Sequence, residues 1–398
     1  MKSLRGVVVL DLTHMLSGPY GTMLLTDLGA RTIKVEPLGG EGTRQLLANS
    51  QDYSRQGMGA YFLTLNRSKE SVCVDLKSEA GRAVFYDLVR KADVVFDNFS
   101  VGVPKRLRID HATLAAINPR IITCSVTGFG ETGPEPDRPA FDQVVQGMGG
   151  GMSITGFADR EPVRSGIPIG DLGGGIFGAL GVLAALVARA QTGRGQHVDV
   201  SMLDAQISLL NYMATMYLMS GVVPERLGNG HFVHVPYNTY KTQTDYIIIA
   251  CIGDAFYEKF LEVVTRPELR KEAYLKQSGR YPDREFIDRV IQEELLTNTA
   301  EYWLAKLRAA RIPCGPVNDF KHALEDPQIL ARRMVVDVPL HGGDVIQVPG
   351  NPIKLSDVGE ENYGTPPRLG EHTEMVLREF LGYELQRIQE LRAANAIA

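Results

Sequence analysis

The sequence predicts an α/β protein with a large, doubly wound parallel sheet and a second, smaller α/β domain. Short apolar runs alternate with helical segments along the first half of the chain, which is the pattern of parallel strands with helices on both faces. The chain has 398 residues, whereas single hydrophobic cores stop growing at about 250–300 residues. We therefore expect two domains.

The large domain opens with a strand at residues 7–10, which read Val-Val-Val-Leu, and Gly18-Pro19 then starts a helix. A strand at 31–35 completes the first strand–helix–strand unit, and the alternation continues to residue 220. Further strands are expected at 71–75, 94–96, 121–126 and 197–200, and the helices at 19–28, 79–91, 111–117, 173–190 and 201–220.

The helix at 173–190 is apolar nearly all round, so we expect it to be buried centrally. Its longest apolar stretch, 178–190, is shorter than the ~20 residues that a membrane span needs. The N-terminus runs directly into a strand without the pattern of a signal peptide. These features predict a soluble, cytoplasmic protein.

Residues 222–238, rich in Gly, Pro and His, are expected to connect the large domain to the smaller one. The smaller domain should contain a strand at 246–251 and helices at 255–265, 283–295 and 299–310. The remainder is expected to be rich in loops and to end in helices at 374–381 and 384–394.

Composition excludes several classes of protein. Hydrophobic residues make up 44% and charged residues 22%, as in ordinary globular proteins. A net charge of -5, with both signs interspersed, disfavours a nucleic-acid or membrane partner. The four cysteines, Cys73, Cys124, Cys251 and Cys314, lack the spacing of a metal site or a disulfide framework, so we expect reduced thiols and no metal.

Asp171 is the most informative residue, because it stands in the glycine-rich stretch 165–178 directly before the apolar helix. Glycines and a helix N-terminus leave backbone N–H groups open to a ligand, beside the positive end of the helix dipole. An aspartate in this place is also typical of a helix N-cap. The pattern alone leaves both interpretations open.

Other motifs are less specific. The glycines of Gly173-x-Gly175-x-x-Gly178 have the spacing of a dinucleotide-binding loop, but no strand leads into them and Asp199 lies inside a strand. His14 follows the first strand, where open α/β sheets bind ligands. Lys69, Asn98, Phe99 and Arg106 also follow predicted strands and suit phosphate groups, although each alone also fits a solvated surface position.

Taken together, these segments resemble the class III coenzyme A transferases, the family of formyl-CoA transferase and carnitine CoA-transferase. The resemblance covers essentially the whole chain, and it depends on the number and order of the motifs. The matching stretches are 9–14 with Gly18-Pro19, 28–36, Asn98-Phe99 with Arg106, 126–130 with Gly133-Pro134, 170–172, 192–196, 312–317 and 369–373.

The resemblance implies that Asp171 attacks an acyl-CoA thioester. An aspartyl anhydride and then an aspartyl-CoA thioester would form, and CoA would pass to a carboxylic acid acceptor. CoA is then a co-substrate, and no tightly bound cofactor is implied. The positions that match the family's CoA contacts are His14, Met15, Leu16, Ser17, Lys69, Asn98, Phe99 and Arg106.

The resemblance also implies a Rossmann-like large domain at 1–221, a connector with a small α/β domain at 222–319, and a return to the large domain at 320–398. Two subunits would interlock like chain links, either as a homodimer or with a sister subunit.

The substrates are expected to include a dicarboxylic donor such as succinyl-CoA. The chain departs from formyl-CoA transferase at Leu16, where that enzyme has Gln, and at Pro37, where it has a basic residue. A glycine-rich flap is expected at 228–236. The candidate substrate contacts are Arg44, Arg138, Phe141, Asp142, His231 and His234.

Two alternatives remain open. An α-methylacyl-CoA racemase shares the glycine-flanked Asp but needs a His in a Gly-His-Asp sequence to move the α-proton. This chain has Phe141 there, which cannot transfer a proton. A non-catalytic CoA-binding subunit of a hetero-oligomer is disfavoured because Asp171 is present.

Overall fold

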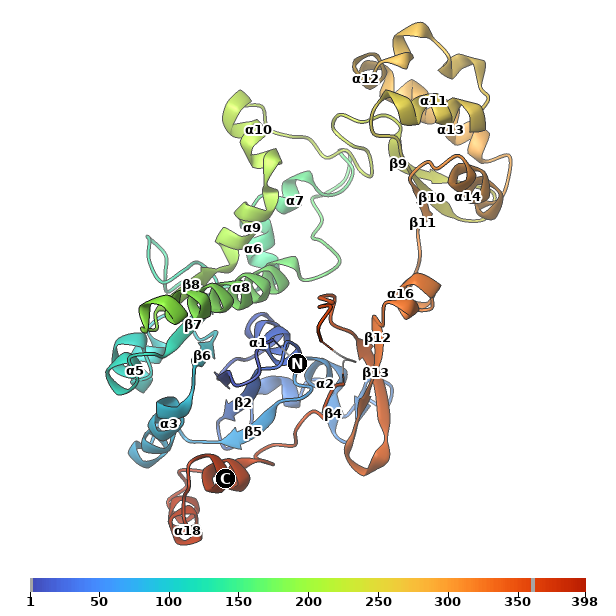
Figure 1. The fold of residues 1–398 in the computed structure, drawn as a ribbon. Coiled ribbons are helices and arrows are strands. Elements are labelled where there is room, and N and C mark those ends of the chain that lie inside the picture. The colour runs from blue at the N-terminus through green and yellow to red at the C-terminus, as the bar shows by residue number, and fades with distance from the viewer. Residues whose placement is uncertain (1–2, 359–361) are drawn as a thin grey trace. The chain divides into compact units, whose positions relative to one another are not determined.

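The computed structural model describes residues 3–358 and 362–398 (Figure 1). Two compact units are formed. The first contains Met1–Gly151, Arg164–Gly221 and Ala331–Ala398, and the second contains Met152–Val163 and Val222–Leu330. The sequence places the return to the large domain at residue 320, whereas the first unit resumes at Ala331. The segment Met152–Val163 joins the second unit without a sequence signal that predicted it.

The first unit is built on a six-stranded parallel sheet in the order β5-β2-β1-β6-β7-β8. Numbered along the chain, this order is 3-2-1-4-5-6, that of a doubly wound sheet. Its strands are β1 Val8–Asp11, β2 Arg31–Glu36, β5 Glu70–Cys73, β6 Val94–Asp97, β7 Ile122–Thr127 and β8 His197–Ser201. The predicted parallel α/β architecture is confirmed, and every predicted strand is present.

Adjacent residues of the strands supply two different cores. Val9 and Phe96 pack with α1 and α8 on one face, whereas Leu10 and Val95 pack with α3 and α5 on the other. This follows from the two-residue period of a strand, and it explains why the central strands β1 and β6 read as apolar runs. The helices of this unit up to residue 220 are α1 Ser17–Asp27, α2 Ala60–Leu65, α3 Glu79–Lys91, α4 Val103–Leu107, α5 His111–Ile117, α6 Asp142–Met148, α8 Ile169–Thr192, α9 Met202–Leu210 and α10 Tyr212–Ser220. Helix α7, Gly151–Ile154, lies almost entirely in the segment Met152–Val163 of the second unit.

Two helix predictions need correction. The helix expected at 201–220 is divided into α9 and α10 at Asn211, whose φ of 48° interrupts the helix. The helix expected at 173–190 begins four residues earlier, at Ile169. The short helices α2, α4, α6 and α7 were not predicted.

Helix α8 packs closely on α1 because the glycines on this face of α8 have no side chain. A Cβ on Gly175 would lie 2.4 Å from the Ser17 carbonyl oxygen, and one on Gly178 would lie 2.7 Å from the Phe96 ring. The glycine spacing therefore serves helix packing, and the likeness to a dinucleotide-binding loop is coincidental.

The burial and length of α8 also differ from expectation. Its glycine face is buried, but Leu180 and Val187 on the opposite face are 57% and 64% exposed. With 24 residues α8 is long and apolar enough to cross a membrane, so the expectation of a shorter apolar helix was wrong. It nevertheless packs on α1 and the sheet, as a core helix does.

The second unit contains an antiparallel sheet in the order β11-β10-β9 covered by helices. Its core gathers aromatic and aliphatic side chains such as Ile247, Tyr257, Phe260 and Trp303. Strands β9 and β11 were not predicted, and β9 begins in the last two residues of the expected connector 222–238. The elements are β9 Tyr237–Lys241, β10 Tyr246–Ala250, α11 Asp254–Val263, α12 Gln277–Arg280, α13 Arg284–Leu295, α14 Ala300–Ala309, β11 Cys314–Pro316, α15 Phe320–Leu324 and α16 Pro327–Ala331.

The C-terminal part returns to the first unit. Val376, Leu377 and Ile388 join the core on the α3 face, and Ile397 pairs with Val74 next to β5. A hairpin, β12–β13, occupies the segment expected to be loops. The remaining elements are β12 Val335–Pro339, β13 Val345–Pro349, α17 Thr373–Met375, the π-helical turn Val376–Phe380 and α18 Leu385–Ala393, with the small pair β3 Ser54–Arg55 and β4 Met58–Gly59 earlier in the chain.

Candidate active site

Asp171 lies in the first turn of α8, at the carboxyl edge of the parallel sheet. Gly174, almost one turn later, lies against Ser17 and against Val126 near the end of β7. Arg189, near the other end of α8, bonds the Asp93 carbonyl directly before β6 begins. The helix thus runs from the strand ends to the strand starts, and Asp171 is at the edge where open α/β sheets bind ligands.

The N-terminus of α8 is capped by Asp142, the first residue of α6. Its Oδ1 accepts the backbone N–H groups of Gly170 at 2.8 Å and Asp171 at 3.2 Å. The backbone N–H of Ile169 donates to the Ile167 carbonyl, and the N–H of Leu172 donates to the Pro168 carbonyl. The expectation that this turn leaves its donors open to a ligand was therefore wrong, because Asp142 and the local backbone occupy them.

Burial raises the pKa of the Asp171 carboxyl to about 6, and the negative charge of Asp142 adds to the effect. Two carboxylates thus share one helix N-terminus, whose dipole favours negative charge. Asp171 remains largely ionised at neutral pH but is more basic than an exposed aspartate.

Tyr61 of α2 stands in the field of the same carboxylates, and sequence reasoning missed it. Burial, together with the negative charges of Asp171, Glu41 and Asp142, raises the pKa of its hydroxyl to about 12. A tyrosine within a short apolar helix carries no signal that separates a site residue from a core residue.

The loop after β1 is fixed by Asn98, which follows β6. The Asn98 side chain accepts the backbone N–H of His14 and donates to its carbonyl, both at 2.8 Å. The His14 ring packs on Phe99 with 5.1 Å between ring centres, and burial lowers the pKa of His14. The structure thus brings these three predicted residues together at the point where the strand order reverses.

The end of that loop starts α1. Met15 has a φ of 59° and is exposed, Leu16 is the N-cap residue, and the buried Ser17 begins the helix. In the described part of the chain no side chain caps this helix. The first N–H groups of α1 are therefore a candidate anion-binding feature.

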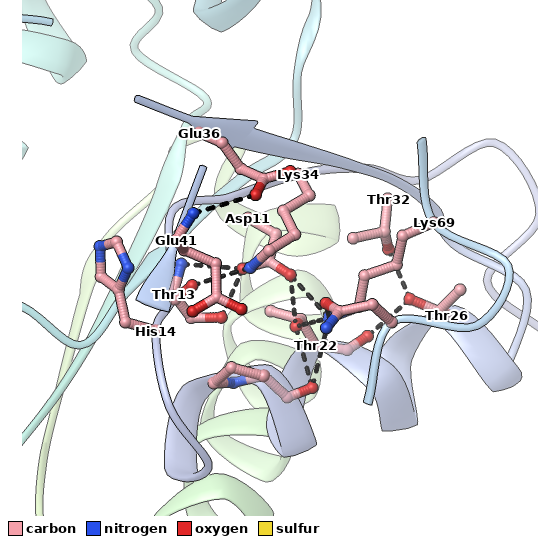
Figure 2. A network of polar contacts seen from close by, with 12 residues as sticks. Asp11, Thr13, His14, Thr22, Thr26, Thr32, Lys34, Glu36, Glu41 and Lys69 are labelled. Carbon is pink, nitrogen blue, oxygen red and sulfur yellow. Dashed lines mark hydrogen bonds and ion pairs between the residues drawn. The ribbon is translucent and has the colours of Figure 1, made fainter. Parts of the chain in front are cut away.

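Lys69 is not placed to contact a ligand. Its side chain is fully buried, and its Nζ donates to Asp11 at 2.7 Å, Thr22 at 2.9 Å and Asn66 at 3.1 Å (Figure 2). Lys34, also buried, donates to the Thr13 carbonyl at 2.9 Å. The interpretation of Lys69 as a phosphate contact therefore needs correction: it supports the ligand loop from beneath.

The charges in this network act on one another (Figure 2). Burial opposes ionisation of Asp11, but the ammonium groups of Lys69 and Lys34 hold the pKa of that carboxyl well below its usual range. Burial lowers the pKa of Lys69 to about 8 despite the attraction of Asp11. Both partners remain charged at neutral pH.

The predicted arginines differ in their surroundings. Arg44 is buried, bonds Glu36 at 2.6 and 2.7 Å and lies over the Phe62 ring, so the prediction that it meets a substrate carboxylate was wrong. Arg138 is exposed and pairs with Glu135. Arg106 is exposed on α4.

The other candidate substrate residues are divided between the units. Phe141, the N-cap residue of α6, is 68% exposed beside Asp142 in the first unit. His231 and His234 line a cavity of about 350 Å³ within the second unit, together with Arg284. The His231 Nδ1 accepts the N–H groups of Val233 and His234.

The four cysteines are free thiols, and only Cys314 is partly exposed. Among residues 3–358 and 362–398, no group of three His, Cys, Asp or Glu side chains is arranged to hold a metal ion.

A doubly wound sheet with a half-buried aspartate at a helix N-terminus on its carboxyl edge is typical of an α/β enzyme whose candidate nucleophile is a carboxylate. The model of CoA-transferase family III matches residues 4–373. The chain belongs to this family and is a class III CoA-transferase.

Three relatives illustrate the match. The chain is 39% identical to acetyl-CoA:oxalate CoA-transferase of Acetobacter aceti over 95% of this chain and 96% of the relative. It is 36% identical to succinyl-CoA:mesaconate CoA-transferase of Haloarcula hispanica over 95% of this chain and 96% of that relative. The crystal structure of a CaiB/BaiF family protein from Brucella suis superposes with a TM-score of 0.84 at 36% identity, covering 95% of this chain and 99% of that one.

Proposed function

We propose that the enzyme transfers CoA from an acyl-CoA to a free carboxylic acid, with Asp171 as the nucleophile. The observation that supports this most directly is the position of Asp171: a half-buried, ionisable carboxylate of raised pKa at the ligand-binding edge of the sheet. A carboxylate is a weak nucleophile, and the raised basicity makes it a better one.

In the first half-reaction, an Asp171 oxygen bonds to the thioester carbonyl carbon, and the C–S bond breaks. The products are a mixed anhydride and CoA thiolate. The thiolate then attacks the aspartyl carbonyl carbon of the anhydride, and the donor leaves as its carboxylate. Asp171 now carries CoA as a thioester.

In the second half-reaction, the acceptor carboxylate attacks the aspartyl thioester and expels CoA thiolate, which forms a new anhydride. The thiolate attacks the acceptor's acyl carbon, giving the new CoA thioester and restoring the Asp171 carboxylate. Every nucleophile is an anion, so the cycle needs no net proton transfer. This agrees with a site that has Phe141 at the place where a racemase needs a proton-transferring His.

Each attack passes through a tetrahedral oxyanion, which requires hydrogen-bond donors. The first N–H groups of α8 are occupied by Asp142. We therefore assign this role to the first turn of α1 at Leu16 and Ser17, whose N-terminus has no side-chain cap in the described residues.

For CoA itself we propose contacts along the loop from His14 to Ser17, at Asn98 and Phe99, and at the exposed Arg106. These groups follow β1 and β6, the two strands at which the sheet order reverses. Asn98 would hold the His14 backbone in position for CoA, and the positive charge of Arg106 would attract a CoA phosphate group.

We propose that one of the substrates is a dicarboxylic acid, with succinyl-CoA or another dicarboxylyl-CoA as donor. The names of two relatives, which pair acetyl-CoA with oxalate and succinyl-CoA with mesaconate, support a dicarboxylate. Within the first unit, Arg138 is a candidate for its second carboxylate, whereas Arg44 is not, because it is paired with Glu36.

We also propose a cytoplasmic dimer of two such chains, interlocked as in the family. Within the first unit, α8 and α10 expose large apolar side chains, including Leu180 at 57%, Leu218 at 79% and Met219 at 84%. Such a surface is typical of an interface. Light scattering that finds a monomer would contradict this part of the proposal.

The reaction is tested by incubating the enzyme with succinyl-CoA and a panel of carboxylic acids and detecting new CoA thioesters by mass spectrometry. A new thioester that disappears with Asp171→Ala supports the proposal. Deuterium entering the acyl α-carbon from heavy water would support a racemase instead. CoA binding without exchange against any donor would support a binding subunit.

A further inference from the structure

A hydrogen-bond chain holds the cap of α8 in place, and Gln146 is its central link. The Gln146 Nε2 donates to Asp142 Oδ2 at 2.7 Å, and its Oε1 accepts the backbone N–H of Ser165 at 2.9 Å. The other Asp142 oxygen accepts the N–H groups at the start of α8. Ser165 and Asp171, on both sides of the turn that leads into α8, are thus tied to α6.

The partners of Gln146 determine its orientation. The Ser165 N–H can only donate, and an ionised Asp142 carboxylate can only accept. A flipped amide would place its oxygen against a carboxylate and its NH₂ against an N–H, so only one orientation makes both bonds. Because Gln146 is only 2% exposed, water does not replace either bond at low cost.

This arrangement fixes a charge. Gln146 lies one helical turn after Asp142 on α6, the spacing at which two helical side chains meet. The Asp142 carboxylate receives three N–H donors, two from α8 and one from Gln146. With both its oxygens engaged, its charge is held at one place beside Asp171.

We propose that Gln146 is a positioning residue, which holds the Asp142 carboxylate at the start of α8 and thereby controls how readily Asp171 attacks. This inference rests on the proposed function of Asp171. Gln146 itself contacts neither substrate nor CoA.

An isosteric pair of variants gives opposite outcomes. Gln146→Leu removes the donor, so the Asp142 carboxylate is no longer held in place, and its negative charge acts less strongly on Asp171. The transfer rate falls in acid as Asp171 becomes protonated, and we call this part of the pH–rate profile the acid limb. In Gln146→Leu the midpoint of the acid limb should shift to lower pH by roughly 0.5–1 unit. Gln146→Glu adds a third carboxylate to the cluster and should move the limb up by a similar amount.

Two controls separate positioning from folding. Gln206→Leu removes an equally buried glutamine of α9 that packs on Gly149, outside the chain from Ser165 to Asp171, and should leave the limb in place. In the Asp142→Asn background, Gln146→Leu should cause no further shift, because the charge it positions is gone. Melting temperatures identify any variant that fails to fold.

The decisive readout does not need turnover. In protein with ¹³C-labelled aspartate, the Asp171 carboxyl resonance, assigned with Asp171→Asn, reports its titration directly. Shifts in opposite directions for Gln146→Leu and Gln146→Glu support the proposal. Unchanged titration in both folded variants overturns it, even if the wild type transfers CoA. Failure of the proposed function is a different result, in which the titration shifts but no acyl-CoA reacts at Asp171.

Discussion

The Asp142 carboxylate accepts the backbone N–H of Asp171 at 3.2 Å, so the group that caps α8 also lies beside the candidate nucleophile. The hydrogen bond from the Asp171 N–H stabilises the start of α8, and the negative charge of the Asp142 carboxylate helps to raise the pKa of the Asp171 carboxyl. Stability and reactivity are therefore connected through a single side chain that comes from another helix.

The rate of transfer should fall in acid with a midpoint near the Asp171 pKa of about 6, because only the ionised carboxylate attacks. Asp142→Asn keeps an oxygen for the two N–H groups but removes the charge, so the midpoint should move to lower pH. Rates under single-turnover conditions between pH 4.5 and 8 measure this. A midpoint unchanged in Asp142→Asn would contradict the account of the pair.

Asp171→Asn should be more stable than the wild type at pH 7.5. The folded pKa of Asp171, about 6, lies above its ordinary value of 3.8, so its contribution to stability is present below about pH 4 and is lost as the pH rises through 6. Because Asn does not ionise, the variant does not lose stability as the pH rises. The difference, about 3 kcal/mol at pH 7.5, should fall to about 0.5 kcal/mol near pH 4. Denaturant titrations at both pH values measure it.

Lys69→Met should destabilise the first unit by about 3–5 kcal/mol, because it leaves the buried Asp11 carboxylate without its closest cation. Calorimetry is the suitable measurement, since the single tryptophan, Trp303, lies in the second unit. The control, Arg90→Met, breaks an exposed ion pair with Asp87 and should cost about 0.5 kcal/mol or less. Equal effects of the two variants would contradict a buried, charged pair.

Gly175→Ala should destabilise the protein by about 2 kcal/mol or more, although alanine favours helix by ~1 kcal/mol. Its Cβ would meet the Ser17 backbone, which cannot move without shifting α1. In the control, Gly173→Ala, the Cβ would lie 3.3 Å from the end of the flexible Leu209 side chain, so the cost should be small. A stable Gly175→Ala variant would mean that the helices can separate.

The sheet was predictable because its central strands are buried on both faces and read as apolar runs, as at 7–10 and 94–96. The hairpin β12–β13 was missed, although residues 335–339 and 345–349 both end in Val-Pro. The start of α8 was placed too late because Ile169-Gly170 reads as turn, whereas Asp142, 28 residues earlier in the chain than Gly170, supplies the cap.

In the candidate site, too, features set by local sequence could be predicted, whereas features set by tertiary partners could not. Asp171 and His14 could be found because their positions follow from local sequence and from the resemblance. Burial could not be foreseen for Lys69 and Arg44, whose charges are neutralised by Asp11 and Glu36. The part played by Gln146 was equally hidden, because it depends on which partners tertiary packing brings to a side chain.

The most direct test of the central claim is mass spectrometry of peptides after incubation with succinyl-CoA and hydroxylamine. An anhydride or thioester on Asp171 reacts with hydroxylamine to leave a hydroxamate, so we expect this modification at Asp171 and its absence without the CoA thioester. If no acyl-CoA tested, including acetyl-CoA, gives a hydroxamate at Asp171 while CoA transfer still proceeds, Asp171 is not the nucleophile.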